Sequence, residues 1–202
     1  MGKDPSGSTP SFSSCRGYHT AVSNELIESL LAEEDRCAQE SHRARWEMLR
    51  AAERRQEAMF GLQAEGLSIR DIAKRLGCSP KVVQDSIEKA KRRRPPMERR
   101  EQRVSWELHR AIADRLRQDP APILEVARRN IDRMKDRRRD EYARGWVEEW
   151  ERLVEGDVSA LIDRMLGTDE RAIDLRQMTP FAGALSQAAR LVAIHKAVAR
   201  AT

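Results

Sequence analysis

The sequence predicts an all-α protein. Charged residues make up 35% of the 202 residues and aromatic residues only 4%, a composition that favours helices with large solvated faces. Apolar residues recur at spacings of three, four and seven along most of the chain, and no alternating pattern long enough for a strand occurs. We expect a disordered N-terminal segment (1–19), a first helical domain (20–94) and a second all-helical domain (98–202).

The first two segments differ in composition. Residues 1–19 are rich in Ser, Gly and Pro without periodicity, which predicts disorder. Residues 20–65 contain no proline and a single glycine, and their apolar positions follow one thin helical stripe that fits one long helix or two. We expect residues 46–64 to support the next helices. We expect the stretch from Asn24 to Met59 to pair with a second copy, which would make a homodimer.

Residues 67–94 predict two short helices joined by a tight turn. Ser68 can cap the first helix, and Asp71, three residues later, can complete a capping box. Gly77 follows the last apolar position, where a helix often ends in the left-handed conformation that costs glycine least. Ser79-Pro80 is typical of the start of the second helix. The segment resembles a DNA-binding helix-turn-helix over its whole length.

This resemblance implies that the outward face of the second helix enters the major groove of double-stranded DNA. Gln84 suits a bidentate pair with adenine, Lys81 can reach guanine or phosphate, and Asp85 could accept from cytosine. The alternative is an ordinary helical hairpin with a solvated basic face. The predicted DNA-binding residues are Arg70, Ser79, Lys81, Gln84, Asp85, Glu88, Lys91, Arg92, Arg93 and Arg94.

The charge is unevenly distributed. Residues 68–94 hold nine basic and three acidic side chains, a net charge of +6, as expected of a phosphate-binding surface. Residues 140–202 hold eight basic and eleven acidic side chains, a net charge of −3. Because the whole chain carries a net charge of +5, residues 1–139 carry +8. The basic part is therefore expected to contact nucleic acid, and the acidic part another partner or only water.

Pro95-Pro96 predicts a hinge, after which stop and start signals divide the chain into six helices. The apolar positions of the first four run from Val104 to Leu116, from Leu124 to Met134, from Tyr142 to Leu153 and from Leu161 to Leu166. The fifth helix is expected to be capped by Thr168 and to reach about Gln177. The last is expected to be capped by Ser186 and to carry Leu191, Ile194 and Val198.

Several classes of protein are disfavoured. The sequence contains no run of eighteen apolar residues, so no membrane span is predicted. It also has no apolar signal-peptide core near the N-terminus, so a cytoplasmic protein is expected. Cys15, Cys37 and Cys78 have the spacing of neither a disulfide framework nor a zinc site. The four histidines lie far from any catalytic partner in the sequence, and we expect His109 and His195 at the surface or at caps. We therefore expect no enzyme, no metal and no cofactor.

Two tryptophans, Trp146 and Trp150, lie four residues apart on one predicted helix. Core packing is the favoured interpretation of such a pair, because it buries a large apolar area. The alternative is an aromatic anchor for a protein partner, ringed by acidic side chains. The residues predicted for such a contact are Trp150, Phe181, Glu148, Glu149 and Glu151.

The sequence LRQMTPFAGAL (175–185), with LHRAIADRL (108–116) upstream and the tryptophan pair between, carries a second resemblance. Over about residues 105–190 it resembles a tail that follows helix-turn-helix motifs in small bacterial regulators, many of them antitoxin-like. The resemblance implies a transcriptional regulator, the antitoxin of a toxin–antitoxin pair, which neutralises its toxin and represses its own operon. The alternative is a phage or plasmid assembly factor, such as a small terminase-like subunit, that recognises a packaging or replication site. An unselective nucleic-acid chaperone is disfavoured by Asp85 and Glu88.

Overall fold

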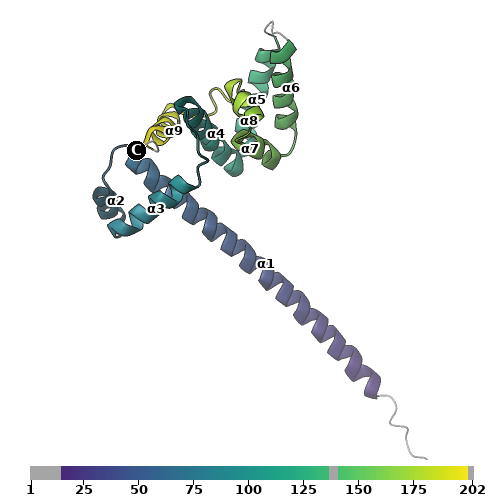
Figure 1. The fold of residues 1–202 in the computed structure, drawn as a ribbon. Helices are drawn as coiled ribbons and strands as arrows, with labels where there is room; N and C mark the ends of the chain where they lie inside the picture. Colours follow the sequence, from purple (N-terminus) through teal and green to yellow (C-terminus); the bar gives the residue numbers. More distant parts are fainter. Residues whose placement is uncertain (1–14, 137–140, 200–202) are drawn as a thin grey trace, which may run out of the picture. The chain divides into compact units, whose positions relative to one another are not determined.

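The computed structural model describes residues 15–136 and 141–199, and in these ranges it contains nine α-helices and no strand (Figure 1). The predicted all-α fold is confirmed for them. No helix in these ranges is both long and apolar enough to cross a bilayer. The helices are α1 (Cys15–Ala64), α2 (Ile69–Leu76), α3 (Pro80–Arg92), α4 (Arg100–Gln118), α5 (Pro120–Lys135), α6 (Glu141–Glu155), α7 (Val158–Leu166), α8 (Glu170–Gln177) and α9 (Gln187–Ala199).

The chain divides into two compact units, residues 1–52 and 53–202. This boundary differs from the one that the sequence predicted at Pro95-Pro96. The reason lies in α9, because Ala199 of this last helix packs against the core formed by the end of α1, α2 and α3. The end of α9 therefore belongs to the same unit as the predicted DNA-binding segment.

Of the first unit, the structure describes residues 15–52 of α1. They form a single helix, because proline is absent from α1 and its two glycines, Gly17 and Gly61, lie near its two ends. Residues 15–19 are helical, which corrects the predicted disorder there; residues 1–14 lie outside the described part. Four large apolar side chains of the predicted stripe region, Leu26, Ile27, Leu30 and Leu31, are 53–60% exposed.

The second unit contains a small core where α1, α2 and α3 meet. Local interactions fix α2 and α3: the Asp71 N–H donates to Ser68 Oγ (3.1 Å), and the Val82 N–H donates to Ser79 Oγ (3.4 Å). Gly77 ends α2 with φ +63°, which lies in the left-handed region. The predicted caps at Ser68 and Ser79 and the glycine exit of α2 are confirmed, and Asp71 Oδ2 accepts from the Ser68 hydroxyl (2.6 Å). The buried residues of this core are Met59, Phe60, Ile72, Ala73, Val83, Ile87 and Ala90.

A larger core lies among α4 to α8. Trp150 is fully buried, and its indole N–H donates to the Leu175 carbonyl (3.1 Å). Phe181, which follows α8, packs edge-on against Trp150 with 5.5 Å between the ring centroids. The favoured interpretation of the tryptophans as core is confirmed. The other buried members are Ile112, Ala113, Leu116, Ile123, Ala127, Ile131, Trp146, Val147, Val154, Leu161, Ile162, Met165 and Leu175.

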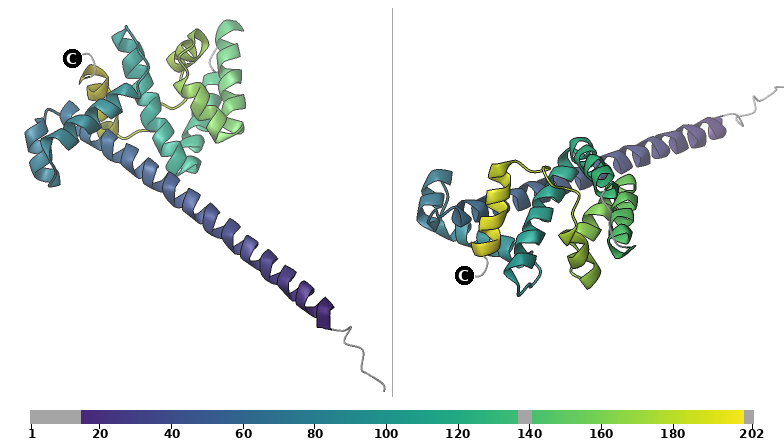
Figure 2. Two further views of the ribbon diagram at one scale, coloured as in Figure 1. Left: turned by 60° about the horizontal axis from the view of Figure 1, so that its bottom comes forward. Right: turned by 90° about the horizontal axis from the view of Figure 1, so that it is seen from above.

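The last helix, α9, lies alongside α4 (Figure 2). Its buried face is formed by Ala193 and Ala197, whereas Leu191 and Val198 are each 43% exposed. The prediction that Leu191 and Val198 belong to the packed apolar stripe of this helix was therefore wrong. Small side chains let two helix backbones approach closely, so alanine rather than leucine faces α4.

One predicted cap also differs. The side chain of Asp169, and not that of Thr168, accepts from the Ala172 N–H (3.1 Å) and caps α8. The other predicted caps of this region are confirmed, since Asp157 accepts from the Ala160 N–H and Ser186 from the Ala189 N–H.

Candidate nucleic-acid interface

The outward face of α3 is polar and exposed. Lys81, Gln84, Asp85 and Glu88 follow the spacing i, i+3, i+4, i+7, so they share one side of the helix, and all four are exposed. The opposite side is anchored, since Val83 and Ile87 are buried at 0% and 2% exposure. An exposed polar face on a helix with a fixed buried face can be presented to a large partner in one orientation.

Two side chains of this face pair with each other. Lys81 Nζ lies 3.3 Å from Asp85 Oδ1, with the side chains 82% and 53% exposed. A pair so open to water contributes little to stability, so both groups can exchange it for contacts with a partner at small cost. Ser79, also exposed, uses its Oγ as the cap of α3 and can still donate its hydroxyl proton.

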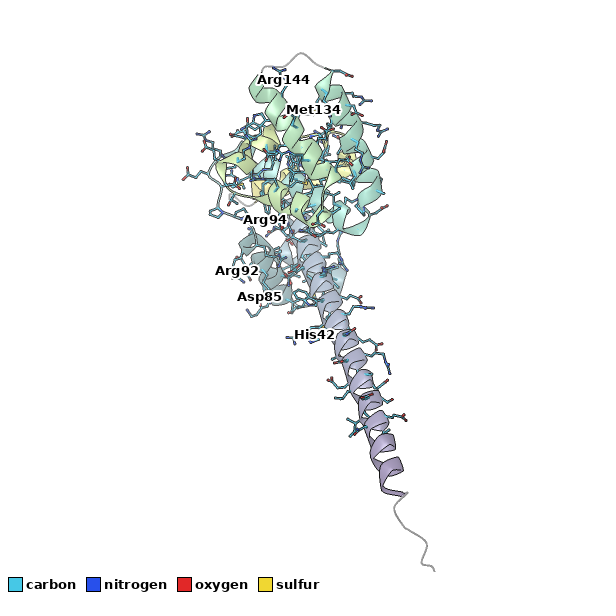
Figure 3. The ribbon with its side chains drawn as sticks, turned by 90° about the vertical axis from the view of Figure 1, so that its right-hand side faces the viewer. His42, Asp85, Arg92, Arg94, Met134 and Arg144 are labelled. Atoms are coloured by element: carbon cyan, nitrogen blue, oxygen red, sulfur yellow. The ribbon has the colours of Figure 1, made fainter. Side chains whose placement is uncertain are left out.

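The basic run at the end of α3 does not form one surface. Arg92 is exposed, as is Asp85, and Figure 3 labels the two along one edge of the α2–α3 pair, with Arg94 nearer α4. Arg93 turns toward the end of α1, where its Nη2 lies 3.1 Å from Glu57 Oε1. Lys91 is half-buried with its Nζ 5.8 Å from the centroid of the Phe60 ring.

The side chain of Arg94 has no exposed surface, which corrects its predicted role in phosphate binding. Its Nη2 donates to Glu57 Oε2 (2.9 Å), its Nε donates to Glu107, and its guanidinium lies 4.5 Å from the centroid of the Phe60 ring. A buried guanidinium of this kind cannot reach a DNA backbone. Arg94 instead joins α3 to α1 and α4.

Glu57 is the centre of this network, which the sequence did not predict. Besides Arg93 and Arg94, it accepts from Arg110 of α4 (2.7 Å), and Lys196 of α9 lies 3.6 Å away. Burial by itself would raise the pKa of Glu57, but hydrogen bonds from Arg110 and Arg94 outweigh it and hold the pKa far below its usual range. One carboxylate therefore ties together four helices. Nothing in the sequence distinguishes Glu57 from the other acids of this highly charged helix, so local patterns could not identify it.

Helix α2 carries exposed basic side chains. Arg70, Lys74 and Arg75 are all exposed, as is Lys89 on α3. With Arg92, these groups add exposed positive charge to the α2–α3 pair, whereas the α3 face itself carries charges of both signs. Such a distribution attracts a polyanion while leaving the central side chains free to make selective contacts.

His109 is buried, although we expected it at the surface or at a helix cap. Its Nδ1 lies 2.7 Å from the Ser105 carbonyl, which can only accept, so Nδ1 carries the proton and Nε2 accepts from the Thr179 hydroxyl (2.9 Å). Burial, with the nearby charge of Arg176, lowers the pKa of His109 to about 4. Among the described residues, no group of three or more His, Cys, Asp or Glu side chains could hold a metal.

The residues predicted to contact a protein partner do not form an exposed aromatic patch. Trp150 and Phe181 are 0% and 3% exposed, because both belong to the α4–α8 core. Glu149 is largely buried and accepts from Arg171 (2.8 Å). Glu148 is exposed, and Glu151 pairs with Lys135. The predicted aromatic anchors are therefore corrected, and of the three acids only Glu148 and, in part, Glu151 reach the surface.

No protein-family model, curated protein or solved structure matches the chain. The exposed face of α3 and the basic residues around it are the features of the described residues from which we infer a function.

Proposed function

We propose that this chain binds double-stranded DNA selectively, with α3 as the helix that enters the major groove. The observation that carries the proposal is the exposed row Lys81, Gln84, Asp85 and Glu88 on a helix that is capped at Ser79 and buried on its other side. A helix in the major groove reads bases with side chains at this spacing.

Each side chain of the row matches a base edge. The Gln84 amide can both donate to and accept from adenine, and Lys81 can donate to guanine. Asp85 and Glu88 can accept from the amino group of cytosine, and both repel phosphate. Two acids on the reading face therefore weaken unselective binding and favour sequence-selective binding.

Phosphate contacts would come from the exposed basic residues on either side. Arg70, Lys74 and Arg75 lie on α2, and Lys89 and Arg92 lie toward the end of α3. Contacts of this kind fix the register of a protein on the duplex, supply much of the affinity and make it depend on salt.

The network around Glu57 supports the proposal through rigidity. Arg94, at the end of α3, is tied to α1 by Glu57 and to α4 by Glu107. A reading helix that is anchored in this way loses less conformational freedom on binding, and less of the interaction free energy is spent on ordering it.

We further propose a homodimer that pairs through the N-terminal part of α1. A single two-helix motif reads only a few base pairs, and such proteins gain affinity by presenting two copies about one DNA turn apart. Leu26, Ile27, Leu30 and Leu31 are exposed side by side. Adjacent large apolar side chains on one helix are typical of an interface.

The regulatory role that we propose is transcriptional repression, with the chain acting as the antitoxin of a toxin–antitoxin pair. Because Trp150 and Phe181 are buried, a toxin would have to be held by charge, and the exposed Glu148 is the predicted acid best available for it. Co-expression with the product of the neighbouring gene tests this role, since an antitoxin must restore growth and co-purify with the toxin.

The DNA-binding proposal is tested by an anisotropy titration. Duplexes from the region upstream of the gene are compared with shuffled duplexes of equal length and composition. Selective binding predicts a clear preference for an upstream duplex that persists as the salt concentration rises. Equal affinity for upstream and shuffled duplexes would contradict the proposal.

A further inference from the structure

A cavity of about 620 Å³ lies within the second unit, bounded by α4, the turn that follows α8, and α9. This volume falls in the range of sites for small organic molecules. It lies on other elements than the α3 face, so it is a separate feature from the proposed DNA interface.

Most of the wall is apolar. Val104, Leu108 and Ile112 contribute from α4, Phe181 and Leu185 from the turn, and Ile194 from α9. Phe181 is itself held by Trp150 of the core behind it. Such a wall suits a hydrocarbon or aromatic body.

One buried cation, Arg176, also lines the cavity and is only 3% exposed. Its Nη1 donates to the carbonyls of Met165 (3.0 Å) and Gly167 (2.7 Å). Its Nε and Nη2 have no hydrogen-bond partner, although both atoms are buried. These two nitrogens form one edge of the guanidinium, the edge that binds both oxygens of a carboxylate.

The other charges of the wall favour an anion. Arg100 and Arg190 are exposed, and Glu101 is the one acid among the lining residues, so the wall has three arginines against one carboxylate. His109 adds no charge at neutral pH, because burial lowers its pKa to about 4. Its hydrogen bond to Thr179 instead links α4 to the turn and keeps the wall in place.

We propose that this cavity binds a small organic carboxylate, with the carboxylate at Arg176 and an apolar body against Leu108, Phe181 and Ile194. A carboxylate seated there compensates the buried guanidinium. A small shift of that group lets its Nε–Nη2 edge donate to both oxygens. Neither feature, the unpaired arginine edge nor the apolar wall, is explained by packing alone.

Calorimetry with a matched pair of probes tests the site in the absence of DNA. The probes are 4-phenylbutyrate and its neutral amide, which differ only in the charged group. The full-length protein should bind the carboxylate at least about tenfold more tightly than the amide. Equal binding of the two probes, or no heat with phenylbutyrate, phenylacetate or octanoate at about 10 mM, would overturn the proposal.

Variants then locate the site. Leu108→Trp fills the cavity and should abolish binding, whereas Leu191→Trp makes the same change at an exposed position of α9 outside the lining and should leave binding unchanged. Arg176→Lys keeps a charge but removes the two-donor edge, and should reduce the preference for the carboxylate, with Arg171→Lys as its control. Circular dichroism checks that each variant is folded. Unchanged binding in folded Leu108→Trp would contradict the assignment.

Discussion

Arg94 and Glu57 form a buried ion pair in which Arg94 Nη2 lies 2.9 Å from Glu57 Oε2. The arginine was expected on a DNA-binding surface, yet its side chain has no exposed area. The pair connects the end of α3 to α1, and Glu107 extends it to α4. The last arginine of the basic run therefore holds the fold together, while Arg92, two residues earlier, remains exposed.

Arg94→Met should lower the free energy of unfolding by about 3 kcal/mol, because it leaves Glu107 buried without its main partner and removes a cation from Glu57. Methionine keeps much of the apolar contact with Phe60, so the loss reports the charge. Urea unfolding measures it. Arg92→Met is the control at an exposed position and should stay within about 0.5 kcal/mol of the unsubstituted protein. Equal effects of the two substitutions would contradict the account.

His109 should make stability depend on pH between about 4 and 6.5. Its pKa is lowered from 6.5 to about 4 in the fold, so between these values the unfolded chain binds a proton that the folded chain does not. Stability is complete above pH 6.5 and falls as the pH is lowered. The difference of about 2.5 in pKa corresponds to about 3 kcal/mol at most.

Urea unfolding at pH 7.5, 6.0 and 5.0 measures this dependence above the range in which most carboxylates titrate. His109→Phe, which retains an aromatic ring beside Trp150, should flatten the curve, and His195→Gln, at a more exposed histidine, should not. A curve that is unchanged in His109→Phe would assign the dependence to another group.

Arg92→Ala should weaken binding to all DNA sequences alike and reduce the slope of log K against log salt by about 1, because one phosphate contact and its released counterion are lost. Arg117→Ala removes an arginine from α4, with its side chain 49% exposed, and should leave the slope unchanged. Anisotropy titrations at several salt concentrations measure both. A slope that is the same in Arg92→Ala would remove this residue from the interface.

Replacing Leu26 and Leu30 together by Glu should give a folded monomer with weakened operator binding, because charges would then occupy the proposed interface. Ala32→Glu lies on the opposite side of α1 and should leave the dimer intact. Sedimentation at micromolar protein measures the mass. An unsubstituted protein that is already monomeric would rule out pairing through α1.

The sequence predicted features that depend on near neighbours. The Ser68 and Ser79 caps and the left-handed Gly77 each require only residues within one helical turn, and all three are present. The exposed positions of α3 followed from the helical period and from the apolar side chains at Val83 and Ile87.

Features that depend on distant residues were missed. The burial of Arg94 depends on Glu57, which lies 37 positions earlier in the sequence. The buried face of α9 is alanine rather than leucine because of how closely this helix approaches α4, a distance that no local pattern encodes. His109 was expected at the surface or at a cap, and its burial was missed because its partner Thr179 lies 70 positions away.

The central claim, that α3 reads bases through Gln84, is tested most directly by selecting bound duplexes from a random library and sequencing them. The unsubstituted protein should enrich one motif. Gln84→Ala should lose the preference for adenine at one position of that motif, at a cost of about 1–3 kcal/mol. Gln118→Ala, at an exposed glutamine at the end of α4, should enrich the original motif. No enriched motif with the unsubstituted protein, or an unaltered motif with Gln84→Ala, would contradict the claim.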